Sequence, residues 1–421
     1  MHRSRTRRGY PRTALWVGGG LTAAAVAWMT VGVPTVVKYP TDLDVAPRYE
    51  GTFRVLVDPA TAAPLDEPIE MPLTVDRRIQ AVGDESGSSR VLVRETIDRR
   101  AGDLIDLTQR NAYVMDRSTL ENVADDRAFA FDESNVVDRS GAYRLNLPFD
   151  TSRDETYDIY KNEIDAVYPM VADDETPTSD IEGLHLSNFT GSVDEGPLSD
   201  AYLAELNEAV PLPESLTLDQ MRPQLLALGI DVDAVVTALT PVLTPEDAAT
   251  LAAFAAEPIP LEYVLSFDGR AAVEPVTGAE VKVTVAETVG ARPQLTSLPD
   301  LQEVLSHHPD VPEAVAASAG MDALAAAPAT PLFSYSYEQT PASVADVADE
   351  ATSMRRQVLL AKVWLPAGLA AAAVLSLVVG AAVYLRRRPR RLGRSRARRP
   401  APRPRPEDEA RDLAGTDRRT T

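Results

Sequence analysis

Residues 363–385 read VWLPAGLAAAAVLSLVVGAAVYL, a run of 23 residues that contains no charged side chain. A helix rises about 1.5 Å per residue, so this run reaches roughly 35 Å and crosses a hydrocarbon core of about 30 Å with some tilt. An aromatic ring stands near each end and arginines follow directly, which predicts a membrane-spanning helix with a cytoplasmic C-terminal flank. The residues predicted to lie at the membrane interface are Trp364, Tyr384, Arg386, Arg387 and Arg388.

The N-terminal segment also combines arginines with an apolar run, but here the arginines come before the run. Residues 1–13 contain five Arg and no acidic residue, and residues 14–37 contain no charge. The apolar run is longer than the roughly 7–15 residues of a signal-peptide core, and bulky Trp28 and Met29 follow the candidate cleavage site. Both features favour a retained helix over a cleaved signal peptide. The glycines at 18–20 let a second helix approach closely, or they reflect a general bias toward Gly and Ala.

The net charge of −21 is divided unevenly along the chain. Residues 386–421 hold 14 Arg and five acids, whereas residues 38–362 hold 23 basic and 58 acidic residues. Basic ends and an acidic middle fit two compartments separated by a membrane, so we expect both termini in the cytoplasm and 38–362 outside the cell membrane. The basic tail either only fixes this topology or, as we expect, also contacts anionic lipids. The acidic middle argues against nucleic-acid binding.

The middle of the chain alternates apolar and polar residues at period two, which predicts β-strands. Such runs occur from 49 to 146, among them 104–109 and 112–116, with turn-like residues at 97–102. Successive runs of this kind predict a meandering antiparallel sheet. The pattern becomes helical and proline-rich in 199–256, which predicts a small helical insertion; the alternative is a mobile lid or a segment that docks a partner.

The fold class expected is therefore α+β, with a mainly antiparallel β domain outside the membrane, a helical insertion and two flanking transmembrane helices. The predicted segments are a basic arm (1–13), a first transmembrane helix (14–37), a first β-rich part (38–198), the helical insertion (199–256), a second β-rich part with an Ala-rich helix at 311–328 (257–362), a second transmembrane helix (363–385) and an Arg/Pro-rich tail (386–421).

Chemical motifs give no support for catalysis. The four histidines are His2, His185, His307 and His308; the last two are adjacent and favour an exposed loop over a metal site, and His185 fits a partly buried strand position. No Walker A, G-x-S-x-G or H-E-x-x-H pattern occurs, and there is no cysteine. We therefore expect no cofactor, no metal and no enzymatic activity. A hydrolase that uses two carboxylates stays open, because acidic pairs are common in this sequence.

Three short motifs carry a resemblance to a known family. They read LPFDT at 147–151, TYDIY at 156–160 and IEGL at 181–184, and VDPAT at 57–61 and VEPVTG at 273–278 accompany them. The chain resembles the actinobacterial porin PorA family, whose members tend to show F-P-F-x-T, T-Y-x-Y-x and I-x-G-L. Leu147 and Ile159 depart from that pattern. The matching positions are Pro148, Phe149, Thr151, Tyr157, Tyr160, Gly183, Pro275 and Gly278.

The resemblance implies a non-enzymatic protein of the envelope of a high-GC Gram-positive bacterium, and it carries over no catalytic residue. Our first hypothesis is that the acidic β domain binds or conducts an envelope component such as a lipid. The layout of two anchors around one β domain is also similar to that of the CD36 scavenger receptors. The alternative is a channel-forming porin, which needs a homo-oligomer because two helices alone enclose no aqueous lumen.

Overall fold

The computed structural model describes residues 10–57 and 64–387. They divide into two compact units. The larger unit is Ala27–Pro366, and the smaller one contains the described residues of Met1–Val26 and Ala367–Thr421. The mixture of antiparallel sheet and helix, with an apolar helix at each end, confirms the predicted fold class.

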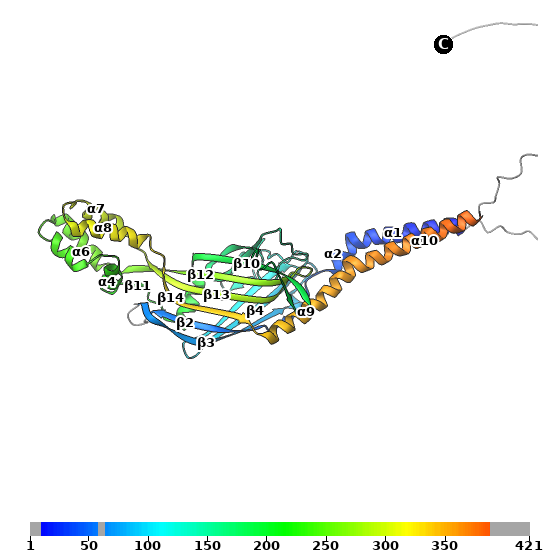
Figure 1. Cartoon of the computed structure of the whole chain (residues 1–421), viewed down its shortest axis with the longest axis horizontal. Helices are drawn as coiled ribbons and strands as arrows, with labels where there is room; N and C mark the ends of the chain where they lie inside the picture. Colours follow the sequence, from blue (N-terminus) through cyan, green and yellow to red (C-terminus); the bar gives the residue numbers. More distant parts are fainter. Residues whose placement is uncertain (1–9, 58–63, 388–421) are drawn as a thin grey trace, which may run out of the picture. The chain divides into compact units, whose positions relative to one another are not determined.

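One antiparallel sheet organises the larger unit (Figure 1). Within the described residues its strands lie in the order β6-β5-β4-β3-β2-β14-β13-β12-β10-β8-β7, and β1, β9 and β11 pair with β3, β10 and β12. The strands are β1 Asp44–Val45, β2 Arg48–Val57, β3 Pro64–Ala81, β4 Arg90–Ala101, β5 Ile105–Asp116, β6 Phe129–Ala130, β7 Tyr157–Lys161, β8 Ala166–Ala172, β9 Thr178–Ile181, β10 Leu184–Pro197, β11 Ser215–Leu216, β12 Ile259–Glu274, β13 Ala279–Pro293 and β14 Thr330–Gln339.

The sequential order β2-β3-β4-β5 confirms the predicted meander, but two details of the prediction were wrong. The runs 104–109 and 112–116 belong almost entirely to the single strand β5, because Arg110 and Asn111 keep its alternation. Residues 97–101, predicted as a turn, belong to β4, and the turn comes at 102–104. Pairing with neighbouring strands on both sides outweighed the local turn preference of Asp and Arg.

The sheet curls, and irregular backbone pairing joins its two edges. Asn122 pairs with Met115 of β5, and its N–H donates to the carbonyl oxygen of Ala142 at 2.9 Å. Tyr143 then exchanges hydrogen bonds with β7: its N–H donates to Asp158 O at 2.8 Å, and its carbonyl accepts from Tyr160 N at 2.9 Å. The linked edges leave few strand groups unpaired, and the inward side chains face one another across an enclosed interior.

Helices α4 to α8 of the larger unit form a lobe beyond one end of the sheet (Figure 1). Their apolar side chains make one core, which includes Met221, Leu225, Leu239 and Leu305. Thr244 caps α6 through a 3.1 Å hydrogen bond from Asp247 N, as its sequence T-P-E-D predicts. The helices are α3 Asp200–Ala209, α4 Leu218–Ala227, α5 Val232–Leu239, α6 Pro245–Ala256, α7 Leu298–Ser306 and α8 Pro312–Ala325, of which α3 packs against β5 rather than in the lobe.

The other end of the sheet is where the chain enters and leaves the larger unit. Helix α9, Pro341–Leu359, packs Val344, Ala348 and Ala351 against the outer side of the sheet. There α2, Val33–Val36, meets the turn of π-helix at Leu360–Trp364. We call this the helix-junction end, defined by the buried cluster of Val33, Val37, Val358 and Ala361.

The smaller unit pairs α1, Tyr10–Ala27, with α10, Leu365–Arg387. Two helical runs, Trp16–Val36 and Pro341–Arg386, contain segments long and apolar enough to cross a membrane, as predicted. A Cβ atom on Gly18 would lie 2.8 Å from Leu377 of α10, so glycine permits this close approach. Gly19 and Gly20 have nothing within 4 Å of the same position, so only the first of the three glycines serves the contact.

Candidate functional site

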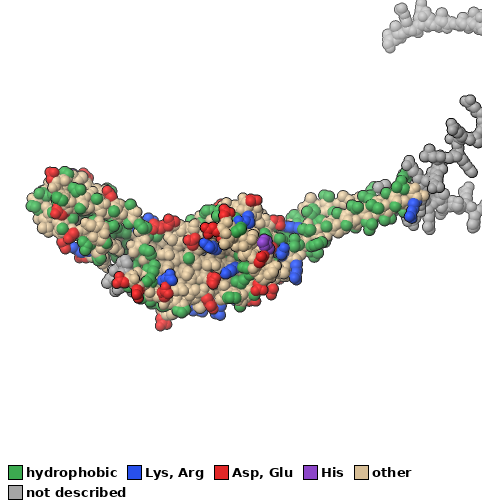
Figure 2. Space-filling model, in the orientation of Figure 1, with side chains coloured by type: hydrophobic (Ala, Val, Ile, Leu, Met, Phe, Trp, Pro, Cys, Tyr) green, Lys and Arg blue, Asp and Glu red, His purple; other side chains and the backbone are tan. Residues whose placement is uncertain are grey.

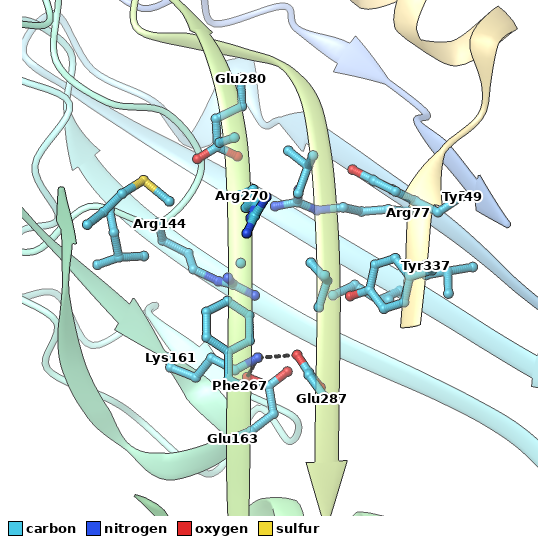
Figure 3. Close-up of a pocket in the computed structure, with 18 of the residues that line it drawn as sticks. Tyr49, Arg77, Arg144, Lys161, Glu163, Phe267, Arg270, Glu280, Glu287 and Tyr337 are labelled. Carbon is cyan, nitrogen blue, oxygen red and sulfur yellow. Dashed lines mark hydrogen bonds and ion pairs between the residues drawn. The ribbon is translucent and has the colours of Figure 1, made fainter. Parts of the chain in front are cut away.

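The interior of the sheet contains a cavity of about 80 Å³ that charged side chains line (Figure 3). We call it the charged cavity. Alternation at period two directs Arg77, Arg99, Lys161 and Glu287 inward together with the apolar core positions of the same strands, whereas the side chain of Arg270 points to the exposed outer face of β12. The charged residues among its lining are Arg77, Arg99, Arg144, Lys161, Glu163, Arg270, Glu280 and Glu287.

A buried ion cluster closes one side of the charged cavity. Lys161 of β7 lies 2.5 Å from a Glu287 carboxylate oxygen and 3.2 Å from one of Glu163, and these three residues are only 1–3% exposed. Arg99 of β4 approaches Glu163 at 3.5 Å, and the Tyr335 hydroxyl donates to Glu287. Burial favours the neutral form of Glu163, but the charges of Lys161, Arg144 and Arg99 outweigh it and hold its pKa well below the ordinary value.

A second buried pair lies beside the first. Arg77 Nε donates to Glu95 at 2.7 Å, and Glu95 also accepts hydrogen bonds from the Tyr113 hydroxyl at 2.7 Å and from Asn111 at 3.0 Å. Burial opposes ionisation of Glu95, yet the Arg77 and Arg144 charges and these hydrogen bonds lower its pKa to about 2. Both carboxylates are therefore anionic at neutral pH and fix cations from three different strands, β3, β4 and β7.

Two charged groups at the charged cavity lack such partners. Within the described residues Arg144 makes one side-chain hydrogen bond, from Nε to the Tyr113 hydroxyl at 3.5 Å, and no ion pair; Glu280 makes neither. Glu280 faces inward because a register shift opposite Ala272 and Val273 leaves Val281 as an extra residue, which turns outward. Burial raises the pKa of Glu280 above its ordinary value.

A larger cavity of about 410 Å³ lies toward the helical lobe, and its walls are mostly apolar. We call it the apolar cavity. Strand residues such as Phe53, Ile105 and Phe333 form one wall, and the segment after α3 forms another. That segment consists of Ala209, Val210, Pro211, Leu212 and Pro213. Small-molecule sites commonly measure about 300–1,000 Å³ and are mostly apolar, so this cavity has the size and lining of a ligand site.

A single layer of side chains separates the two cavities. Along β14, Phe333 lines the apolar cavity, Tyr337 lines the charged cavity and Tyr335 lies between them. Tyr202 and Leu206 of α3 complete this layer in the same buried cluster. Alternate residues of a strand are about 7 Å apart, so the layer is one side chain thick.

A third cavity, of about 80 Å³, lies toward the helix-junction end and is called the junction cavity. It shares Tyr49, Arg77, Glu280 and Val283 with the charged cavity, so the two adjoin. The apolar cavity shares no lining residue with either of them. Polar and apolar spaces are thus segregated along the interior of the sheet.

The motif residues gather near the helix-junction end. Leu147 N donates to Gly278 O at 3.0 Å and Asp150 N donates to Val276 O at 3.2 Å, so the motifs at 147–151 and 273–278 pair with each other. Phe149 packs against the junction cluster. Lys362, just before the second apolar run, donates to Asp150 at 2.5 Å. The two motifs therefore anchor the chain where it leaves the larger unit.

Side chains at other motif positions make hydrogen bonds in the same region. Thr151 donates to Pro148 O at 2.6 Å, and the Tyr157 hydroxyl accepts from Ser152 N at 2.7 Å. Tyr160 donates to Asp165 at the end of a short 3-10 turn. Two further positions occupy hairpin turns, Pro275 between β12 and β13 and Gly183 between β9 and β10.

The predicted interface residues and histidines do not join this site. The side chains of Trp364, Tyr384 and Arg386 are exposed. Arg387 ends α10, whereas Arg388 and the rest of the basic tail lie outside the described residues, so the contact with anionic lipids stays a prediction.

His185, His307 and His308 lie elsewhere on the larger unit, and His2 lies outside the described residues. His185 was expected to be partly buried, but its side chain is 69% exposed beside Asp180. His307 Nδ1 lies 3.1 Å from Asp247, and His308 Nε2 lies 3.7 Å from the same carboxylate. Within the described residues no group of three metal-binding side chains occurs.

Comparison with known families places these features in context. The family model for porin PorA matches residues 11–382. The chain belongs to the porin PorA family. No curated protein sequence matches it. Family membership confirms the resemblance carried by the motifs at 147–151, 156–160 and 181–184, and together with the curled sheet it identifies a porin-like membrane protein.

Sequence reasoning missed all three cavities. Arg99 was assigned to a turn, and Lys161 and Glu163 follow a motif that was considered only for its aromatic residues. Two signals were present in the sequence. Lys161 is one of only four lysines in the chain. Glu95 and Arg99 alternate in step with the apolar residues Val91, Val93 and Ile97, so they lie on the same face of β4. Charged residues at positions that the period-two pattern assigns to the apolar face indicate that the interior of the sheet is polar.

The pairing of the two motifs predicts unequal effects of two glycine substitutions. Gly278 and Gly183 both have positive φ, +73° and +76°, so alanine at either costs roughly 1–2 kcal/mol of left-handed strain. A Cβ on Gly278 would also lie 1.9 Å from Leu147 O, whereas a Cβ on Gly183 meets nothing within 4 Å. We expect Gly278→Ala to lower the melting temperature of the full chain clearly more than Gly183→Ala. Equal shifts would show that the motif contact does not matter for stability.

Glu205 of α3 predicts a pH-dependent contribution to stability. Its Oε2 atom is buried without a hydrogen-bond partner in the described structure, and burial raises its pKa to about 7. The folded state holds this proton more tightly than the unfolded chain, so stability declines as the pH rises from about 4.5 to about 7. Glu205→Gln should remove this decline and raise the melting temperature more at pH 8 than at pH 5, with exposed Glu208→Gln as the control. A gain of the same size at both pH values would contradict the assignment.

Proposed function

We propose that the larger unit is a non-enzymatic, extracytoplasmic binding domain that takes an apolar chain of a cell-envelope component, such as a lipid, into the apolar cavity. The observation that carries the proposal is the cavity of about 410 Å³ with mostly apolar walls. Each methylene group moved from water into such a space contributes about 0.8 kcal/mol, so a long alkyl or isoprenoid chain gains enough free energy to bind. The buried carboxylates of Glu95, Glu163 and Glu287 are held by cations, and we assign them no hydrolytic step.

The outer face of the sheet supports a position in water rather than in lipid. Arg94 and Arg100 of β4 and Arg110 of β5 point outward and are exposed. In the space-filling view, red and blue side chains are spread over the part of the larger unit that contains the sheet, which supports the same conclusion (Figure 2). A strand surface that contacts hydrocarbon is apolar, and a charge at the bilayer midplane costs roughly 2–4 kcal/mol.

We propose that α1 and α10 hold this domain at the outer surface of the cell membrane, with both termini in the cytoplasm. Arginine-rich ends flank both apolar runs, which supports this topology through the positive-inside rule. Reporter domains fused before Met1 and after Thr421 should both be active only as cytoplasmic reporters. A periplasm-type or cell-surface signal from either fusion would contradict the topology.

Filling the apolar cavity should abolish binding of the apolar chain. Ala209 lines the cavity at the end of α3, whereas Ala204 on the same helix is exposed. We expect full-length protein in phosphatidylcholine nanodiscs to bind a fluorescent long-chain fatty acid. Ala209→Trp should weaken this binding at least tenfold, because the indole occupies the space of several methylenes. Ala204→Trp is the matched control and should bind as the unchanged chain does.

Two outcomes would overturn the binding proposal: equal affinity of the two tryptophan variants, or no binding of any alkyl probe. The second candidate function is that of an oligomeric porin, which the family name favours. Two helices per chain enclose no lumen, so this function needs several copies. Ion conductance of the purified protein in planar bilayers, together with absent alkyl binding, would favour the porin over the binding domain.

A further inference from the structure

Within the described residues, one cation that faces the charged cavity has no ion-pair partner. Four cationic and three carboxylate side chains face it, because Arg270 points to the exposed outer face of β12, and Glu95 adds a fourth carboxylate from behind the lining through its pair with Arg77. The charges of Lys161, Glu163 and Glu287 are matched among themselves and Arg99. Arg144, without an ion pair in the described structure, is the cation left over on the inside.

The guanidinium group of Arg144 is aimed into the cavity. Figure 3 shows the guanidinium groups of Arg77 and Arg144 reaching toward its centre from opposite sides, with Glu280 at one end and the pair of Lys161 and Glu287 at the other. Burying an unpaired cation is costly, so such a group needs water or an anion beside it. Arginine forks are especially suited to the paired oxygens of carboxylate and phosphate groups.

We propose that the charged cavity is an oxyanion site, in which Arg144 and Arg77 bind a carboxylate or phosphate group. Its volume of about 80 Å³ holds roughly five waters, and an oxyanion replaces several of these. Glu280 faces the same space and repels the anion. The raised pKa of Glu280 lessens that repulsion, because a larger fraction of the carboxyl is neutral.

The adjoining junction cavity supplies a path for the anion. It continues from the shared residues Tyr49, Arg77 and Glu280 to α9, where Glu350 is exposed. The apolar cavity has no residue in common with this path. The oxyanion site is therefore distinct from the apolar cavity, and its ligand is either a free anion or the headgroup of an amphiphile.

Titration calorimetry tests the site on full-length protein in phosphatidylcholine nanodiscs, with empty nanodiscs subtracted. Inorganic phosphate and hexyl phosphate are the probes, and both should bind. Arg144→Gln should weaken binding roughly tenfold or more, since a hydrogen bond to a charged group contributes about 1.5–3 kcal/mol. Arg110→Gln, the same change on the outer face of β5, should leave it unaltered. Affinity at least tenfold higher for hexyl phosphate would identify a headgroup site, and equal affinities would identify a free-anion site.

Glu280→Gln keeps the test independent of misfolding. It removes a negative charge from the cavity and should tighten binding of both probes, an effect that a damaged fold cannot produce. The inference is overturned if neither probe binds to the unchanged chain, if Arg144→Gln binds as tightly as Arg110→Gln, or if Glu280→Gln weakens binding. Ala209→Trp leaves inorganic phosphate binding unaltered under this proposal, so failure of the apolar-chain proposal is separately visible.

Discussion

The ion cluster around Lys161 fixes the interior of the sheet. Lys161 comes from β7, Glu287 from β13 and Arg99 from β4, so the cluster joins strands far apart in the sheet order. An ion pair in low dielectric is weak evidence for net stability, but removal of one partner costs roughly 3–5 kcal/mol because the other charge stays buried. A register shift in any of these strands would separate the paired charges, so we infer that the cluster favours the observed arrangement of strands.

Because the curled sheet surrounds buried charges, its interior is divided into a polar part and an apolar part. Fixed cations and carboxylates keep the middle of the interior polar, whereas aromatic and aliphatic residues dominate toward the helical lobe. The layer of Tyr335, Tyr202 and Leu206 separates these environments. An apolar chain that moved through the whole sheet would have to displace this layer and then pass charges held by 2.5–3.5 Å contacts. Binding at one end needs no such rearrangement, which is why we favour it over open conduction.

The membrane imposes the second constraint. The two apolar runs lie at opposite ends of the chain. If one membrane receives both, the chain has to enter and leave the larger unit at the same end. The structure meets this requirement with the junction cluster of Val33, Val37, Val358 and Ala361 and with the paired motifs at 147–151 and 273–278. Gly278 is part of this junction because only a residue without a Cβ atom fits beside the carbonyl oxygen of Leu147. The motifs at 147–151 and 273–278 thus lie at the junction, whereas Ile159 of the motif at 156–160 lines the charged cavity.

The sequence alone determined the membrane helices, the antiparallel meander, the cap of α6 and the family, because each depends on local spacing or charge that the chain carries in order. Only the tertiary structure revealed that Arg99, Lys161 and Glu287 meet, that α7 and α8 join the helices of 199–256 in one lobe, and that Val281 is the residue which turns Glu280 inward. Those features depend on strand register and on contacts between residues far apart in the chain, such as the 126 positions between Lys161 and Glu287. A period-two pattern states which residues share a face, but it does not state which strands that face will meet.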